Sequence, residues 1–256
     1  MSARWEDVFG LPQEALAGDR RVSKALLARQ AELTRLEQRS LERVERIEHL
    51  ATVQKSTTRI LPHVDGERDI QAVVFLRVAM AAGSAAFAET ARLLHKSFPN
   101  PTVIVLEGTG VACVSAVTTR RSLAEQGATV VDEEASTGAF DPGDPAWAGL
   151  LDALALARLP QADLLAYLTD MIRAIRLSRA IPVTGAYPSC DPVRADELMR
   201  LIAEHDGLEA EVRAIRAQKA DKNLSLNETA KLRMRMKETD GRRECVAEEI
   251  REICNG

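Results

Sequence analysis

The chain has 256 residues, and 46% of them are hydrophobic. This length and apolar content can bury a core as one large domain or two small ones, so disorder throughout is excluded. The 34 basic and 38 acidic residues give a formal net charge of -4, which excludes a globally basic coat and confines any polyanion site to a local patch. Aromatic residues make up only 4%, so we expect an aliphatic core.

The N-terminal segment carries Glu6 and Asp7 and has no continuous apolar stretch, so we expect no secretory signal. No uncharged apolar run reaches the about 18 residues that a membrane span needs. We therefore expect a cytoplasmic protein with no membrane partner. The cysteines never form a CxxC pair, so we expect reduced thiols rather than a disulfide framework or a zinc site. They are Cys113, Cys190, Cys245 and Cys254.

The first third of the chain contains several predicted elements. Residues 19–50 alternate basic and acidic side chains around apolar positions spaced three to five apart, which predicts an amphipathic helix. Residues 53–61 are rich in β-branched side chains, which predicts a strand, and residues 62–69 are expected to turn the chain. The apolar run 70–80 predicts a second strand, and helical spacing returns over 85–98.

A β-hairpin is predicted after this helix, which ends at Pro99-Asn100-Pro101. The runs 102–106 and 111–119 are β-branched and are separated by a short segment with two glycines. Residues 129–132 are a candidate edge strand. These elements predict a small mixed sheet with helices on one face.

The second half of the chain is predicted to be helical. Residues 146–159 and 161–180 both have helical periodicity. The Pro- and Gly-containing segment 181–191 is expected to be a linker or a functional loop.

A helical hairpin is predicted at the C-terminal end. Asp191 followed by Pro192 is typical of a helix start, and this helix is expected to continue to about residue 219. Ser225 and Glu228 have the spacing of a capping box for a last helix. Together the patterns predict an α+β protein. We expect a sheet domain over 1–145 and a helical domain over 146–256 that ends in a charged hairpin over 192–254.

The predicted hairpin is locally basic, because residues 213–243 contain ten basic and four acidic residues. Such a patch can bind a phosphate backbone without reading base sequence. The alternative is a solvated helix face that serves solubility, and no aromatic residue lies among the charges to stack on bases. The candidate DNA-binding residues are Arg213, Arg216, Lys219, Lys222, Lys231, Arg233, Arg235 and Lys237.

Six polar residues are the best candidates for a second, polar site: Lys55, Thr57, Thr58, His95, Ser115 and Arg120. A structural histidine at a helix C-terminus is the alternative for His95. Ser115 lacks the GxSxG context of a serine hydrolase. We therefore identify no catalytic residue.

Common catalytic and cofactor motifs are missing from the sequence. The acids Asp132, Glu133 and Glu134 would alternate between the faces of a strand and would not converge on a metal. The strands lack the acidic residue and Glu-x-Lys pattern of restriction nucleases, and neither GxxxxGK[ST] nor GxGxxG occurs. We expect no metal, no cofactor and a non-enzymatic role.

Five segments resemble the bacterial domain-of-unknown-function family DUF4391. They are RRVSKALL at 20–27, IEHLATVQKSTTRIL at 47–61, LLHKSFPNPTVIVLE at 93–107, VSAVTTRR at 114–121 and QKADKNLSLNETAKLR at 218–233. The chain departs from the family pattern at three places. It has Lys55-Ser56-Thr57-Thr58 for Lys-Pro-Thr-Thr, Pro99-Asn100-Pro101 for Pro-Tyr-Pro, and Thr119-Arg120 for Lys-Arg.

The resemblance implies a genomic setting beside a superfamily-two helicase and a DNA methyltransferase, in restriction-like or antiphage loci. We therefore expect a non-enzymatic accessory subunit that docks a helicase or methyltransferase and touches DNA. One alternative is a cryptic nuclease-like enzyme that uses the six polar residues. Another is a structural homodimer joined through helices 192–252. Its apolar contact positions would be Leu198, Ile202, Leu208, Val212 and Ile215.

Overall fold

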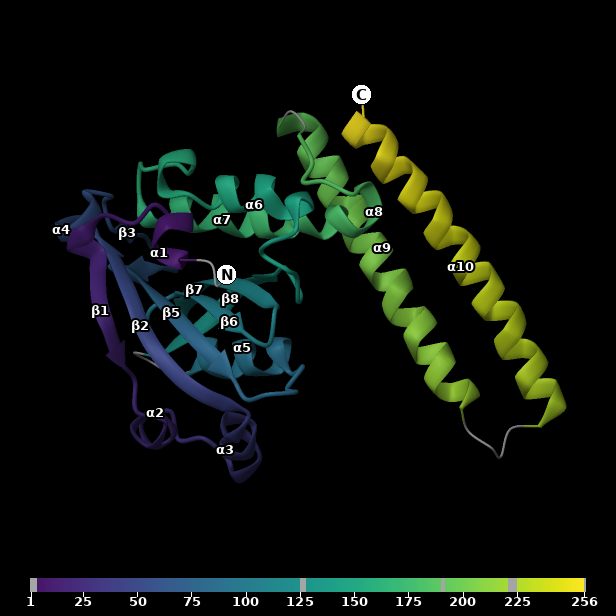
Figure 1. Cartoon of the computed structure of the whole chain (residues 1–256), viewed down its shortest axis with the longest axis horizontal. Helices are drawn as coiled ribbons and strands as arrows, with labels where there is room; N and C mark the ends of the chain where they lie inside the picture. Colours follow the sequence, from purple (N-terminus) through teal and green to yellow (C-terminus); the bar gives the residue numbers. More distant parts are fainter. Residues whose placement is uncertain (1–3, 125–127, 190–191, 221–224, 256) are drawn as a thin grey trace. The chain divides into compact units, whose positions relative to one another are not determined.

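The computed structural model describes residues 4–124, 128–189, 192–220 and 225–255 (Figure 1). The chain forms two compact units, residues 1–178 and residues 179–256. This division differs from the predicted boundary after residue 145, because the helix over Leu164–Leu177 packs against the sheet.

The first unit is built on a six-stranded sheet with the order β1-β2-β5-β6-β7-β8. Strands β5 and β6 are parallel and the other neighbours are antiparallel, so the sheet is mixed, as predicted. A separate two-stranded ribbon, β3 (His63–Val64) with β4 (Asp69–Ile70), lies in the predicted turn. The strands of the large sheet are β1 (Leu16–Arg21), β2 (Val44–Gln54), β5 (Ala72–Met80), β6 (Thr102–Glu107), β7 (Ala112–Arg121) and β8 (Thr129–Ser136).

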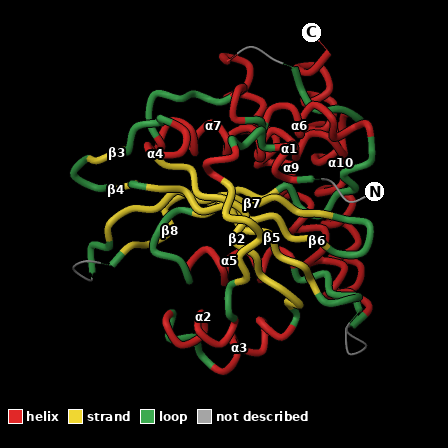
Figure 2. The backbone as a smooth tube through the Cα atoms, turned by 60° about the vertical axis from the view of Figure 1, so that its left-hand side comes forward, coloured by secondary structure: helices red, strands yellow, loops and turns green. Residues whose placement is uncertain are grey.

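Helices cover both faces of this sheet, whereas one face was predicted (Figure 2). Ile104 and Leu106 of β6 join a core with helix α5, while Val103 and Val105 on the opposite face are equally inaccessible to solvent. A strand with both faces buried needs a covering layer on each side, and α7 packs on β7 and β8. The α+β class is confirmed.

The helices of the first unit are mostly short. They are α1 (Trp5–Val8), α2 (Lys24–Gln30), α3 (Arg35–Glu42), α4 (Lys55–Thr58), α5 (Phe87–Lys96), α6 (Ala148–Ala153) and α7 (Leu164–Leu177). Single 3-10 turns occur at Gln13–Ala15, Pro145–Trp147, Leu156–Arg158 and Ser178–Ala180.

The structure differs from the predicted elements at several places. The helix predicted over 19–50 is replaced by β1, α2, α3 and β2, and the strand predicted over 53–61 ends at Gln54 and continues as the helical turn α4. The helix predicted over 146–159 is broken into α6 and two 3-10 turns. The other predicted strands and the helices over 85–98 and 161–180 are confirmed, with shifts at their ends.

The second unit consists of α8 (Ile181–Thr184) and an antiparallel hairpin of α9 (Pro192–Lys219) and α10 (Leu226–Asn255). Two ion pairs connect the antiparallel helices, Arg242–Glu204 and Arg235–Glu211, each at 2.7 Å. The predicted capping box at the start of α10 is confirmed. Ser225 N donates to Glu228 Oε2 at 2.9 Å, and Glu228 N donates to Ser225 Oγ at 3.2 Å.

The predicted helix cap at Asp191 and the thiol of Cys190 fall outside the described residues. In the part of the chain that the structure describes, no helix is both long enough and apolar enough to cross a membrane.

Candidate functional site

His95 and Ser115 of the predicted polar site do meet, in the interior of the first unit. His95 lies in the last turn of α5 and is 1% exposed. Its Nε2 atom is 2.8 Å from Ser115 Oγ on β7, and its Nδ1 atom is 2.5 Å from Thr102 Oγ1 on β6. The three side chains thus tie one helix to two strands.

The hydrogen bonds of this cluster define the protonation of the imidazole. Ser115 Oγ donates to the Ala135 carbonyl oxygen at 3.0 Å, so it accepts from His95 Nε2. His95 Nδ1 then accepts from the Thr102 hydroxyl, which leaves the ring neutral. Burial lowers the pKa of His95 to about 3, in agreement with this assignment. A buried hydroxyl that donates to a backbone carbonyl is not available as a nucleophile, so this cluster serves the packing of the sheet unit.

Lys55, Thr57 and Thr58 form a separate feature at the end of β2. Gln54 N donates to Thr57 Oγ1 at 3.1 Å, and Thr57 Oγ1 bonds to the Thr52 carbonyl oxygen at 2.9 Å. Local bonds of this kind compete with strand pairing, so the hydroxyls cap the turn α4. Strand β2 is three positions from β7 in the sheet, a separation of roughly 14 Å at the usual spacing of strands. The structure therefore does not bring these residues to His95.

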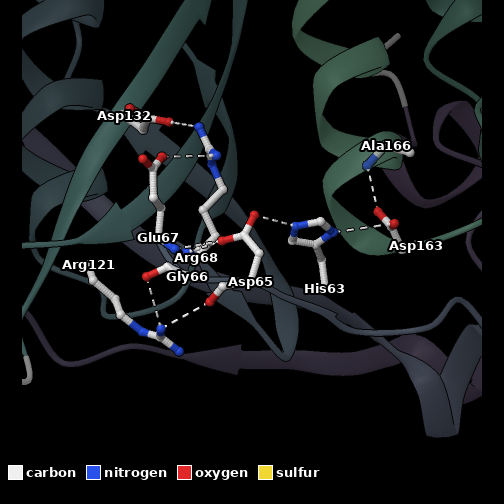
Figure 3. A network of polar contacts seen from close by, with 9 residues as sticks. All are labelled: His63, Asp65, Gly66, Glu67, Arg68, Arg121, Asp132, Asp163 and Ala166. Carbon is white, nitrogen blue, oxygen red and sulfur yellow. Dashed lines mark hydrogen bonds and ion pairs between the residues drawn. The ribbon is translucent and has the colours of Figure 1, made fainter.

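Arg120, the sixth predicted residue, binds Asp132, which belongs to a polar network that sequence reasoning did not find. Figure 3 shows the other members of this network around Asp132, Arg68 and Arg121. The guanidinium of Arg120 is 3.3 Å from Asp132 Oδ1 on β8, and Arg68 binds the other oxygen of the same carboxylate at 2.5 Å. Arg121 donates to the carbonyl oxygens of Asp65 and Gly66. These contacts tie the β3–β4 ribbon to the edge of the large sheet.

His63 connects the same ribbon to helix α7 (Figure 3). Its Nε2 atom is 2.9 Å from Asp65 Oδ2 and its Nδ1 atom is 3.3 Å from Asp163 Oδ2. Asp163 also caps α7 by accepting from Ala166 N at 2.9 Å. With a carboxylate at each ring nitrogen, the pKa of His63 is raised, chiefly by the hydrogen bond to Asp65.

The pKa of Asp65, which binds His63, shifts in the opposite direction. The pKa of Asp65 is lowered to about 2, first by the bond from His63 and then by the backbone amides of Arg68 and Glu67. Because the two carboxylates flank the ring from opposite sides, they do not converge on one point. Across the described ranges, no three His, Cys, Asp or Glu side chains are placed to hold a metal ion.

The predicted DNA-binding residues lie on the half of the α9–α10 hairpin next to the segment that connects the two helices (Figure 1). This distal half falls within residues 213–243, and the rest of both helices forms the proximal half. Of the predicted residues, those exposed to solvent are Arg213, Arg216, Lys231, Arg233, Arg235 and Lys237. Lys219 is half-buried, and the guanidinium of Arg235 is paired with Glu211. Lys222 lies outside the described residues.

The apolar positions proposed for a homodimer are already buried in one chain. Leu198, Ile202, Leu208, Val212 and Ile215 are at most 8% exposed, and α9 packs along α10. A second copy could use this seam only by replacing the α9–α10 contact.

The fold and these features define an α+β protein with a polar ribbon on its sheet unit and a basic helical hairpin. A family model described as Domain of unknown function (DUF4391) matches residues 9–242. The chain belongs to this family. No curated protein and no solved structure matches the chain.

Proposed function

We propose that this protein is a non-enzymatic accessory subunit of a bacterial DNA restriction-modification or antiphage defence system. In this proposal it docks a helicase or methyltransferase partner and contacts DNA phosphates through the distal half of the α9–α10 hairpin. The concentration of uncompensated basic side chains on that half is the observation that carries the proposal.

Most of the described basic side chains on the distal half of the hairpin are not neutralised by acidic side chains of the protein. Within the described residues, six of the candidate side chains form no ion pair: Arg213, Arg216, Lys219, Lys231, Arg233 and Lys237. A duplex carries closely spaced negative charges, and each phosphate that a basic side chain neutralises releases counterions. A rigid pair of helices that presents such side chains therefore favours a polyanion without selecting its sequence.

The polar clusters of the sheet unit support a binding role over the nuclease-like alternative. The His95–Ser115 pair is sealed in the core, and Arg120 is held by Asp132. Each of these groups has a structural partner that explains its position.

The partner in the proposal comes from the family resemblance, which implies a locus shared with a helicase and a methyltransferase. Affinity purification of the tagged protein at low salt, with mass spectrometry and a nuclease-treated control, tests this part. Recovery of either enzyme after nuclease treatment would support docking. Recovery of the protein alone would remove the docking part of the proposal.

The DNA contact is tested by fluorescence anisotropy with a short labelled duplex over a series of salt concentrations. The variant Lys231→Gln/Arg233→Gln/Lys237→Gln should bind more weakly, and the slope of log K against log salt should become shallower by up to about 3. The control is Arg200→Gln, an exposed arginine on the proximal half of α9. Equal slopes for wild type and the triple variant would refute the assignment of the hairpin.

A further inference from the structure

A second group of basic side chains surrounds two cavities at one end of the large sheet. The larger cavity, about 740 Å³, is open and lies between α3 and the turn 81–86 that follows β5. Arg39, Glu42 and Arg43 line one side of it, and the small residues of the turn line the other. Ala82, Gly83 and Ala85 of this turn are exposed.

The second cavity, about 310 Å³, lies where β1, α2 and the start of β2 meet. Its charged lining residues are Arg21, Lys24, Arg46 and one acid, Glu45. Arg21 is exposed, and among the described residues its guanidinium has no acidic partner. The same holds for Arg39 in the larger cavity.

Two hydrogen bonds to neighbouring backbone carbonyl groups connect lining residues of these two cavities to the start of β2. Lys24 Nζ donates to the Val44 carbonyl oxygen at 2.6 Å, and Ala81 N donates to the Arg43 carbonyl oxygen at 2.8 Å. Arg43 lines the larger cavity and Glu45, two residues further on, lines the smaller one, so the two cavities adjoin at the start of β2.

The balance of charge on this surface favours an anion. Five basic side chains line the cavities against two acidic ones, Glu42 and Glu45. Two of the five have acidic partners: Arg43 binds Glu89 at 2.7 Å, and Arg46 binds Glu48 at 3.2 Å. Lys24 binds a neutral backbone carbonyl group, which leaves its charge uncompensated. Arg21, Lys24 and Arg39 keep uncompensated charge, and they are distributed over both cavities.

We infer that this end of the sheet, lined by Arg21, Lys24 and Arg39, is a second binding surface for the phosphates of a nucleic acid strand. Two adjoining basic cavities suit successive phosphates better than one isolated anion, because the cations are spread along the surface. The larger cavity also lies outside the carboxyl end of β5, which with β6 forms the only parallel pair among the described strands; ligands of α/β sheets commonly bind there. The inference shares its ligand class with the proposed function but uses different residues.

The variant Arg21→Gln/Arg39→Gln tests the surface, since both side chains are exposed and their loss leaves no buried charge. The control is Lys55→Gln/Arg59→Gln, which removes two exposed charges at the other end of β2. That end is roughly 35 Å away at the usual rise of a strand. Arg21→Lys/Arg39→Lys keeps the charge and should restore binding if the contact is electrostatic.

The measurement is the anisotropy of the same labelled duplex, and of its single strand, against salt. We expect the Arg21→Gln/Arg39→Gln variant to bind about 10-fold more weakly at low salt and to lose up to about 2 from the salt slope. The control should match wild type. Circular dichroism of each variant checks that it is folded.

The outcomes separate this inference from the proposed function. If the hairpin variant loses affinity while Arg21→Gln/Arg39→Gln keeps the wild-type slope on both ligands, the sheet surface is overturned and the hairpin assignment stands. If only Arg21→Gln/Arg39→Gln loses affinity, the sheet surface stands and the hairpin assignment falls. If wild type binds neither ligand, both fall.

Discussion

Acid should destabilise the sheet unit through His95, which the fold holds in its neutral form. Burial lowers the pKa of His95 from 6.5 to about 3. Between these values the unfolded chain binds a proton that the folded chain does not, so stability is complete above about pH 6.5 and falls as the pH decreases toward 3. At about pH 5 the unfolded state gains roughly 2 kcal/mol from this one group.

Urea unfolding followed by tryptophan fluorescence measures this effect in the sheet unit alone. The chain has two tryptophans, Trp5 and Trp147, and both are buried in the first unit. This choice of probe matters because a chain of two units need not unfold in one step. The free energy of unfolding is obtained at pH 7 and at about pH 5 for wild type and for His95→Gln.

The test compares how much unfolding free energy each protein loses between pH 7 and about pH 5. His95→Gln should be less stable at pH 7 by about 1–3 kcal/mol, because the hydroxyls of Ser115 and Thr102 lose their partner. Its further loss at about pH 5 should be smaller than that of wild type by roughly 2 kcal/mol. Contributions from the other histidines cancel in this comparison. Equal losses in both proteins would refute the neutral, buried imidazole.

Three further predictions concern His63, three glycines and the cap of α10. The pKa of His63 is raised, so its stabilising effect is complete below about pH 6.5 and is lost as the pH rises through the folded pKa. His63→Gln should therefore lower stability more at pH 6 than at pH 9, and an equal loss at both would contradict the two carboxylate contacts. Gly207→Ala and Gly241→Ala should each stabilise the hairpin by about 0.5–1 kcal/mol, since a Cβ at either position meets no atom within 4 Å. Gly185→Ala should instead destabilise by about 1 kcal/mol because that residue has a φ of +77°. Unfolding followed by circular dichroism measures the stability of all three glycine variants. A loss of stability in Gly207→Ala would contradict the open space around that residue. Ser225→Ala should remove the capping box and cost about 1 kcal/mol in the same assay; no change would mean that the start of α10 is frayed.

The sequence allowed the hairpin and the β6–β7 pair to be predicted because their signals are local. The spacing of Ser225 and Glu228 encodes a cap that the structure contains. The glycines between 106 and 111 likewise mark a turn between two strands that pair in an antiparallel manner. Such features depend on neighbouring residues and not on tertiary context.

Strand β2 was mistaken for a helix because of two irregularities in its pairing. Its register with β5 shifts between Val44 and Arg46 and again between His49 and Ala51. Among the buried residues of β2, Val44, Ile47 and Leu50 are three apart, which is also the spacing of a helix face. Bulges break the alternation on which strand prediction depends.

The polar contacts of the sheet unit could be predicted only in part, because the topology of the sheet brings their members together. His95 and Ser115 meet because α5 covers β6 and β7 pairs with β6, and no short-range pattern encodes this arrangement. His63 and Asp163 are 100 residues apart. Their contact depends on the ribbon lying beside the start of α7, which spacing along the chain cannot reveal.

The two halves of the hairpin carry opposite net charge, so an electric field favours one orientation of the hairpin. Residues 213–243 carry ten basic and four acidic side chains, whereas 192–212 with 244–255 carry three basic and ten acidic ones. A polyanion attracts the first group and repels the second. The hairpin should therefore approach DNA end-on, and its proximal half should resist lying along the duplex. Contact would then be confined to a short stretch of backbone, however long the DNA.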